Sequence, residues 1–341
     1  MQPGASAPGL YGVNSRKEMK SMAQTTVTSP VLVPKTGIRR FWLNFKRNWQ
    51  LHLMMLIPFL YLAIFHYLPM YGMQISFKEY SPRLGIPGSE WVGLENLKDF
   101  FGYYQWTNLV VNTLALSLYS IFAGFPIPII LALVLHVNTN KVLKKVAQNV
   151  SYVPHFISLV VMIGILNTVL NPVSGFLGYI NKAFGNLAYE DIRASKTAFR
   201  HLYIWSGIWQ GAGWSTIMYV SALSAVPDEL HEAAKLDGAS RLRRVWSVDL
   251  PTIMPTIAIM LIMRFGSVMS VGYQKAYLMQ NSMNIDVSEL ISTYVYKQGI
   301  RNGNMSFGSA VGLLNSIINT VLVFVVNWVT NLLTDNEMGL F

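Results

Sequence analysis

The chain has 341 residues, of which 52% are hydrophobic and only 12% are charged, about half the charged fraction of an average soluble domain. This composition excludes an ordinary soluble globular protein and predicts a membrane protein. The absence of cysteine excludes disulfides, thiolate catalysis and cysteine metal sites, while the net charge of +10 fits either anionic lipid or nucleic acid as a neighbour.

The N-terminal segment, residues 1–40, is expected to be disordered, basic and cytoplasmic, because Pro, Ser, Thr and Gly are spread through it. It contains no apolar core followed by a cleavage site. It is therefore not expected to be a secretory signal peptide.

Six segments farther along the chain are long and apolar enough to cross a bilayer, which takes about 20 residues per helix. They are 51–75, 107–136, 148–171, 201–226, 251–272 and 308–333. Several contain proline or glycine, which lipid tolerates where neighbouring helices satisfy the freed backbone groups. We therefore predict an all-α polytopic membrane protein whose six transmembrane helices pack as a bundle, with a close helix contact at Gly211-Ala212-Gly213.

The distribution of Lys and Arg predicts the orientation of these spans. An even number of spans puts both termini on one side, and the loops on that side carry more basic residues than the opposite loops. The basic residues nearest the membrane on that side are Arg39, Arg40, Lys46, Arg47, Lys141, Lys144 and Lys145. The positive-inside rule therefore places both termini in the cytoplasm, and lipid rather than nucleic acid accounts for the positive charge.

The cytoplasmic loop 227–250 is predicted to form a helix–turn–helix. Pro227 and the two acidic residues after it suit the start of a helix. Gly238 is placed to adopt the left-handed conformation that ends one. Ser240 is expected to cap a second short helix, and Asp249 is expected to cap the fifth span.

The sequence of this loop, EAAKLDGASRLRRVWSVDLP, resembles the coupling loop, or EAA loop, of type I ABC importer permeases. Other stretches resemble one carbohydrate branch of that family, the LplB-like oligosaccharide and polysaccharide permeases, which are relatives of the maltose-transporter permeases. These stretches are PFLYLAIFHYLPMYG, WVGL, VPHFIS and residues 292–312. The resemblance covers roughly residues 40–341 and implies a type I ABC importer permease fold with a cytoplasmic coupling helix.

The resemblance also implies a domain organisation. Residues 41–106 would form the first transmembrane helix and an extracytoplasmic loop. Residues 107–333 would form a permease core of five helices, with the coupling loop 227–250 inside it.

By the same resemblance, the chain is expected to be the permease subunit of an ATP-binding cassette importer in the bacterial cytoplasmic membrane, translocating an oligosaccharide that is either neutral or acidic. It contains no Gly-Lys dipeptide and hence no phosphate loop. We therefore expect it not to be an enzyme and to bind no cofactor, with ATP and Mg²⁺ held by partner chains. The implied partners are a second homologous permease, two ATPase subunits, an extracytoplasmic solute-binding protein, the oligosaccharide and membrane lipid.

Two other function classes remain as alternatives. A self-sufficient secondary solute carrier would transport without partners and usually has more spans. A membrane-embedded enzyme would need paired histidines or carboxylates at the depth of the spans, whereas Arg264 is the clearest ionisable residue inside one.

The resemblance assigns the contact with the ATPases to seven residues of the coupling loop. They are Glu232, Ala233, Ala234, Asp237, Gly238, Ala239 and Arg243. Glu232 would enter a cleft of the ATPase dimer, and the small neighbours would allow a close approach.

Arg264 is the first candidate for the substrate pathway, because an arginine at mid-membrane costs at least ~2.5 kcal/mol and should face the bundle or water. The alternative is a structural pairing with a neighbouring helix. Trp205, Trp209 and Asn315 are further candidates, although an interfacial belt or packing is the commoner role for such tryptophans and helix–helix bonding for such an asparagine. No catalytic residue and no metal ligand is predicted; the helix around His231 lacks the second histidine of a zinc-protease motif.

The outer loop 273–307 is placed either to contact a binding protein or to be an ordinary solvated loop. Its polar residues are Tyr273, Lys275, Asp286, Glu289, Lys297 and Arg301. Mixed charge suits a transient, salt-sensitive contact.

Overall fold

The first apolar segment of the chain forms a helical unit of its own. The computed structural model describes residues 45–185 and 191–333 and divides into two units, residues 1–70 and 71–341. The first unit contains α3 (Trp49–Leu62), the π-helix η1 (Ala63–Tyr67) and α4 (Leu68–Met70). None of their residues is buried within this unit. The N-terminal segment 1–40 lies outside the described residues.

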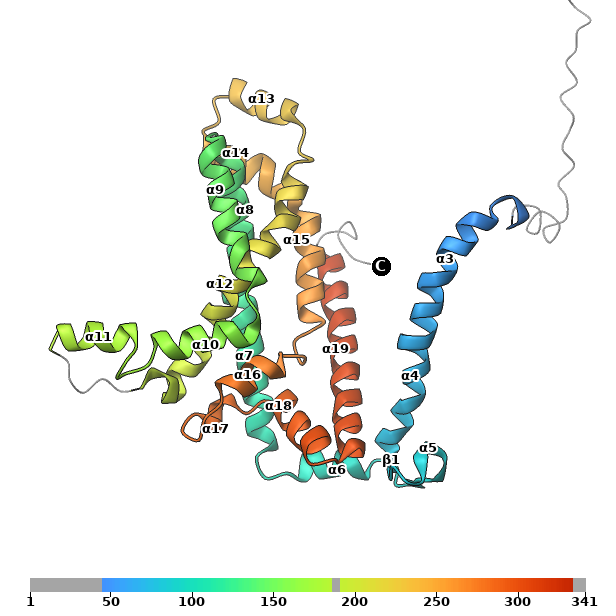
Figure 1. The fold of residues 1–341 in the computed structure, drawn as a ribbon. Helices are drawn as coiled ribbons and strands as arrows, with labels where there is room; N and C mark the ends of the chain where they lie inside the picture. Colours follow the sequence, from blue (N-terminus) through green and yellow to red (C-terminus); the bar gives the residue numbers. More distant parts are fainter. Residues whose placement is uncertain (1–44, 186–190, 334–341) are drawn as a thin grey trace, which may run out of the picture. The chain divides into compact units, whose positions relative to one another are not determined.

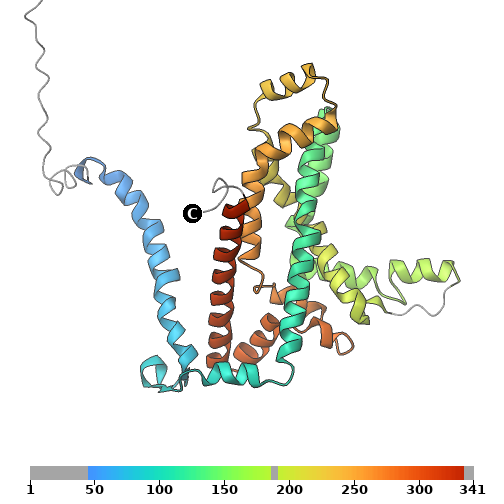
Figure 2. The same ribbon diagram turned by 180° about the vertical axis from the view of Figure 1, so that it is seen from behind.

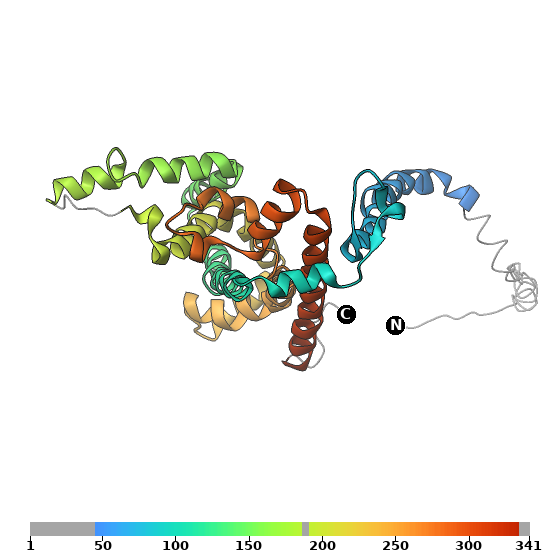
Figure 3. The same ribbon diagram turned by 90° about the horizontal axis from the view of Figure 1, so that it is seen from below.

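The second unit begins with a small cap. Its elements are the 3₁₀-helix η2 (Tyr71–Phe77), β1 (Lys78–Glu79), α5 (Gly85–Gly88), β2 (Glu90–Trp91) and α6 (Glu95–Gly102). The two strands pair antiparallel, with Lys78 opposite Trp91. Asn96 of α6 donates its amide to the carbonyl of Ser76 at 3.1 Å, which ties the helix to the hairpin. Figure 3 shows α6 lying across this end of the unit.

A bundle of helices follows the cap. Its first half contains α7 (Trp106–Gly124), α8 (Pro126–Val137), α9 (Lys141–Tyr152), the 3₁₀-helix η3 (Val153–Phe156), α10 (Leu159–Val169), α11 (Phe176–Ala183), the 3₁₀-helix η4 (Ile192–Ala194) and α12 (Lys196–Leu223). Its second half contains α13 (Asp228–Leu236), α14 (Arg241–Arg244), the π-helix η5 (Val245–Asp249), α15 (Leu250–Phe265), α16 (Tyr273–Met279), α17 (Ile285–Ser288), α18 (Ile291–Val295), the π-helix η6 (Tyr296–Arg301) and α19 (Met305–Leu333).

Helix α12 is central to the bundle, since it contacts α7, α8, α9 and α15. Figure 2 shows α7 and α8 as one column and α15 beside α19. Three buried clusters hold these helices together. One joins α6, α7, α18 and α19 through Phe100, Leu109, Ile121, Val268, Met269, Ile291, Phe307 and Val311. A second contains Leu116, Ile204, Ala276 and Leu290. The third joins α8, α12 and α15 through Ala132, Tyr219, Leu223 and Ile253.

The predicted close contact in the fourth span is confirmed at Gly213. A Cβ atom on Gly213 would collide with the backbone carbonyl of Ser151 in α9, whereas a Cβ on Gly211 would meet nothing within 4 Å. Glycine therefore lets the backbones of α12 and α9 touch, as small residues do in membrane bundles.

Four helical runs in the described part of the chain are long and apolar enough to cross a membrane. They are Trp49–Phe77, Trp106–Val137, Arg241–Phe265 and Met305–Leu332. They cover the predicted first, second, fifth and sixth spans. At most 22% of the apolar stretch of each run is buried, so most of that surface is left for lipid or a second membrane protein.

The predicted third span, 148–171, is not one straight helix. The helices Lys141–Phe156 and Leu159–Val169 meet at 101°, and Figure 1 shows α10 turning away from α9. Ser158 leaves the helical conformation between them, with ψ of 149°, and accepts a hydrogen bond from the Val161 amide at 3.3 Å. A side-chain cap thus starts a new helix where hydropathy alone predicted a continuous one.

Helix α12 covers the predicted fourth span, 201–226. It has 28 residues and is about 42 Å long, which exceeds the hydrocarbon core of a bilayer. It is not among the four apolar runs, and it carries the polar residues Arg200, His201 and Gln210. The fifth predicted span, 251–272, ends early at Phe265.

Candidate functional site

The coupling loop is held in shape by its own backbone. Gly238 has φ of +77°, the left-handed conformation that residues with a Cβ adopt at a cost. Its amide donates to the carbonyl of Lys235 at 3.0 Å, and the amide of Ala239 donates to the carbonyl of Ala234 at 2.9 Å. This pair of hydrogen bonds is a Schellman motif, so the predicted end of the first helix is confirmed.

The second helix of the loop starts as predicted but continues further. Ser240 accepts a hydrogen bond from the Arg243 amide at 3.3 Å, which is an N-terminal cap. From there α14 runs through η5 into α15 as one helical run. Asp249 has helical backbone angles and makes no capping hydrogen bond, so its predicted role as a cap is wrong.

The residues assigned to the ATPase contact lie together on the surface of the loop. Of the seven, Glu232, Ala233, Asp237, Gly238 and Arg243 are exposed, and Ala234 and Ala239 are half-buried. Large apolar side chains of the same loop are also exposed: Leu236 is 90% exposed, Leu242 74% and Trp246 69%. Figure 1 shows α13 and α14 at the end of the second unit opposite α6.

A group of cavities meets at Arg264. A largely apolar one of about 380 Å³ is lined by Phe125, Trp214 and Met260 as well as Arg264. Two more polar cavities of about 200 and 220 Å³ also include Arg264. Their hydroxyl and amide side chains are Ser117, Ser120, Tyr203, Gln210, Ser215, Ser267 and Ser270. Arg264 is exposed and lines three cavities of the bundle, an environment that suits a charged side chain at this depth.

Lys275 of α16 supplies a second positive charge to one of these cavities. Its side chain is only 8% exposed, its Nζ donates to the carbonyl of Tyr203 at 2.6 Å, and it lies 4.6 Å from the centre of the Tyr203 ring. Burial lowers the pKa of Lys275 to about 8 because a low-dielectric environment disfavours the charged form.

The burial of Lys275 corrects one prediction for the loop 273–307, since this residue does not lie on its surface. Three other charged residues of the loop, Asp286, Glu289 and Lys297, are already in ion pairs: Asp286 with Lys196 at 2.5 Å, and Glu289 with Lys297 at 2.6 Å.

The four substrate-pathway candidates do not gather in one cavity. Trp205 and Trp209 line a separate apolar cavity of about 320 Å³ together with Met162 and His201. Asn315 is half-buried, and its side-chain oxygen has no hydrogen-bond partner in the described part of the chain. Of the four candidates, only Arg264 lines the cavities described above. Lys275, which was predicted to lie in the outer loop 273–307, lines one of them.

Three further residues meet where the coupling loop joins the bundle: His136, His231 and Asp249. The helix that carries His231 contributes no other residue to this group. Because the other two come from α8 and η5, no spacing in the sequence could have revealed the group.

Comparison with known proteins places this geometry in a family. Residues 124–335 match the family described as "Binding-protein-dependent transport system inner membrane component". Protein LplB of Bacillus subtilis (strain 168) is 40% identical over 92% of this chain and 97% of its own length. The polygalacturonan/rhamnogalacturonan transport system permease protein YteP of the same organism is 38% identical, over 89% of this chain and 95% of its own length.

Two solved structures are also similar. A bacterial ABC transporter involved in the import of the acidic polysaccharide alginate has a chain that superposes with a TM-score of 0.78 at 33% identity, covering 86% of this chain and 98% of that one. The second is a bacterial alginate ABC transporter in complex with an alginate pentasaccharide-bound periplasmic protein. It gives a TM-score of 0.79 at 32% identity, over 88% of this chain and all of that chain.

The chain therefore belongs to the family of inner-membrane components of binding-protein-dependent transport systems. It is a multi-pass membrane permease of an ABC importer with the type I permease fold.

Proposed function

We propose that this permease imports an acidic oligosaccharide and is driven by separate ATPase subunits that dock on the coupling loop. A second permease chain, two ATPases with their ATP and Mg²⁺, and an extracytoplasmic solute-binding protein complete the transporter. Both termini and the coupling loop face the cytoplasm. This chain binds no nucleotide of its own.

The exposure of the coupling loop is the observation that supports docking of the ATPase subunits. Leu236, Leu242 and Trp246 present large apolar side chains beside the exposed Glu232 and Arg243. Exposed large apolar side chains are typical of a protein interface, and the turn at Gly238 and the cap at Ser240 fix the local shape of the loop. It would therefore move as one body and transmit a displacement of the ATPases to α12 and α15.

Two cations, the buried Lys275 and the exposed Arg264, support the proposed substrate. Arg264 and Lys275 line the same polar cavity, together with serine hydroxyls and the amide of Gln210. Hydroxyl and amide groups suit a sugar ring, and two cations that line one cavity favour an anionic ligand. YteP is a polygalacturonan/rhamnogalacturonan permease and the similar transporter imports the acidic polysaccharide alginate, which supports a uronate-containing oligosaccharide as the cargo.

Charge reversal at Glu232 tests the docking surface. In Glu232→Lys, the ATPases should no longer copurify with the permease, and uptake should fall to background while the protein stays in the membrane. Asp99→Lys is the matched control, since it makes the same charge change at an exposed position of α6, at the other end of the unit. The control should retain the ATPases. Normal uptake by Glu232→Lys with the ATPases still bound would contradict the proposal.

A further inference from the structure

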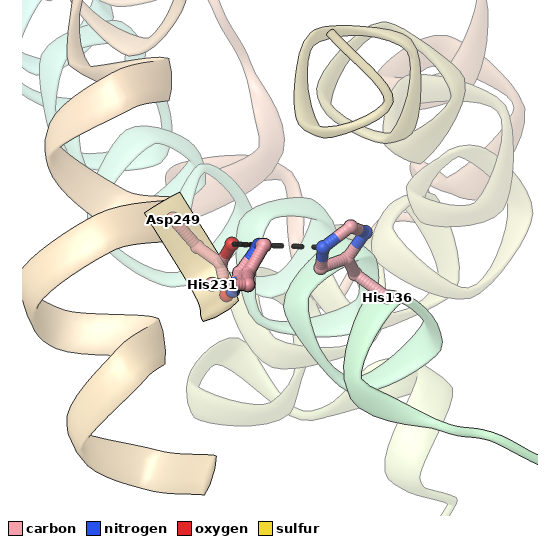
Figure 4. A group of neighbouring side chains, drawn as sticks. All are labelled: His136, His231 and Asp249. Atoms are coloured by element: carbon pink, nitrogen blue, oxygen red, sulfur yellow. Dashed lines mark ion pairs between the residues drawn. The ribbon is translucent and has the colours of Figure 1, made fainter. Parts of the chain in front are cut away.

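The side chains of His136, His231 and Asp249 converge from three segments that are distant in sequence. His136 lies in the last turn of α8, His231 lies in the coupling helix α13, and Asp249 is the last residue of η5. Nε2 of His231 lies 3.2 Å from Oδ1 of Asp249, and Nε2 of His136 lies 3.5 Å from the same oxygen. Figure 4 shows the two imidazole rings facing this carboxylate.

Two atoms of the group are buried without a hydrogen bond. Asp249 is only 2% exposed. Neither its Oδ1 nor Nε2 of His231 has a hydrogen-bond partner in the described part of the chain, although the two atoms are close. Buried polar atoms are almost always hydrogen-bonded, and an exception requires an explanation such as an ion. The two atoms are 3.2 Å apart, yet their relative orientation is not that of a hydrogen bond.

The spacing of these atoms fits a tetrahedral metal ion. Zn²⁺ binds histidine nitrogen and carboxylate oxygen at about 2.0–2.2 Å, which separates neighbouring ligand atoms by about 3.3–3.6 Å. The two distances to Oδ1 of Asp249, 3.2 and 3.5 Å, are close to this value. The two histidine nitrogens lie within 4.8 Å of each other. Because His136 is partly exposed, its ring can rotate and shorten this nitrogen–nitrogen distance to the tetrahedral value.

The charges around the group set the expected affinity. The adjoining pocket of about 430 Å³ is also lined by Asp228, which would attract a cation, and by three basic side chains that would repel one: Lys235, Arg241 and Arg244. The ligand set itself contributes one negative charge and two neutral imidazoles. Binding should therefore be weaker than in zinc sites built from thiolates, and the pocket leaves room for a water in the fourth position.

We propose that His136, His231 and Asp249 form a binding site for a first-row divalent cation of the Zn²⁺ type. The bound ion would join the coupling helix to α8 and to the start of α15. It would thus fix the joint through which α13 is attached to the bundle. This site depends on the ligand chemistry alone and does not rest on the proposed substrate or partners.

Co²⁺ titration of the purified full-length chain, carrying no polyhistidine tag, tests the site. Tetrahedral Co²⁺ gives an intense visible absorption, so the wild type should show one such ion per chain, displaced by equimolar Zn²⁺. His231→Gln and Asp249→Asn should each lose this signal. His201→Gln is the control, because His201 lies in α12 and bonds to the Tyr119 hydroxyl. It should bind Co²⁺ like the wild type.

If a variant fails to fold, a measurement on the wild-type protein alone tests metal binding. Zn²⁺ should raise its melting temperature in proportion to the logarithm of the metal concentration above the dissociation constant. Three results would overturn the site: no tetrahedral Co²⁺ signal in the wild type, equal loss of the signal in His201→Gln, or undiminished binding by a well-folded His231→Gln. The group would then be an ion pair without a metal.

Discussion

At the scale of single residues, Lys275 makes the proposed substrate cavity sensitive to pH. Burial lowers the pKa of Lys275 to about 8, so its positive charge is present below pH 8 and is lost as the pH rises through that value. If the cargo is anionic, its binding should weaken over the same range. We therefore expect uptake of an acidic oligosaccharide by the reconstituted transporter to fall severalfold between about pH 7 and pH 9.

Two variants separate this effect from a general loss of activity. Lys275→Gln keeps a donor for the Tyr203 carbonyl but no longer titrates, so its uptake should be low and flat across this range. Arg264→Gln removes the other cation of the cavity and leaves Lys275 in place, so it should lower uptake at every pH and leave the slope intact. A wild-type profile that matches that of Lys275→Gln would refute the role of the lysine.

At the scale of elements, the packing of α12 against α9 depends on one glycine. In Gly213→Ala the added methyl group would collide with the carbonyl of Ser151, so the two helices must separate. Overpacking of this kind costs about 1–3 kcal/mol. We expect a lower melting temperature for the purified permease, measured by thermal unfolding in detergent. Gly211→Ala, two residues earlier in the same helix, meets nothing within 4 Å and should melt like the wild type; equal melting of both alanine variants would contradict the contact.

At the scale of the whole molecule, the orientation in the membrane follows from the basic loops and is open to direct test. The natural chain has no cysteine, so a single introduced cysteine reports its own side. Leu236→Cys in the coupling loop and Tyr104→Cys after α6 replace residues that are 90% and 82% exposed. In cells lacking the ATPases, a membrane-impermeant maleimide should label Tyr104→Cys from outside.

The cysteine at position 236 should react only after the cells are permeabilised. Labelling of Leu236→Cys in intact cells would reverse the proposed orientation and remove the basis for docking a cytoplasmic ATPase. Equal labelling of both variants after permeabilisation is the control for the intrinsic reactivity of the two sites.

The parts of the molecule that were predictable from sequence are those held by short-range interactions. The coupling loop is an example, because the turn at Gly238 and the cap at Ser240 depend on hydrogen bonds between residues no more than five apart. Long apolar segments are likewise predictable, since the cost of an unpaired backbone in lipid makes such a segment helical whatever its neighbours are.

Predictions from local sequence were wrong where one residue type is compatible with two structural roles. Ser158 caps a new helix within an apolar stretch, which bends the third span. Asp249, in a good position for a cap, is instead turned toward the two histidines. In both cases the residue type allows either outcome, and the surrounding packing chooses between them.

The sequence by itself determined that this chain is a helical membrane protein with a polar helix–turn–helix, the coupling loop, between two apolar helices. Only the tertiary structure decided which side chains meet: Lys275 beside Arg264, and His136 beside His231 and Asp249. The reason is physical. Contacts between residues far apart in the chain depend on how the helices cross and rotate, and hydrophobic patterning specifies the apolar face of a helix without specifying its partner.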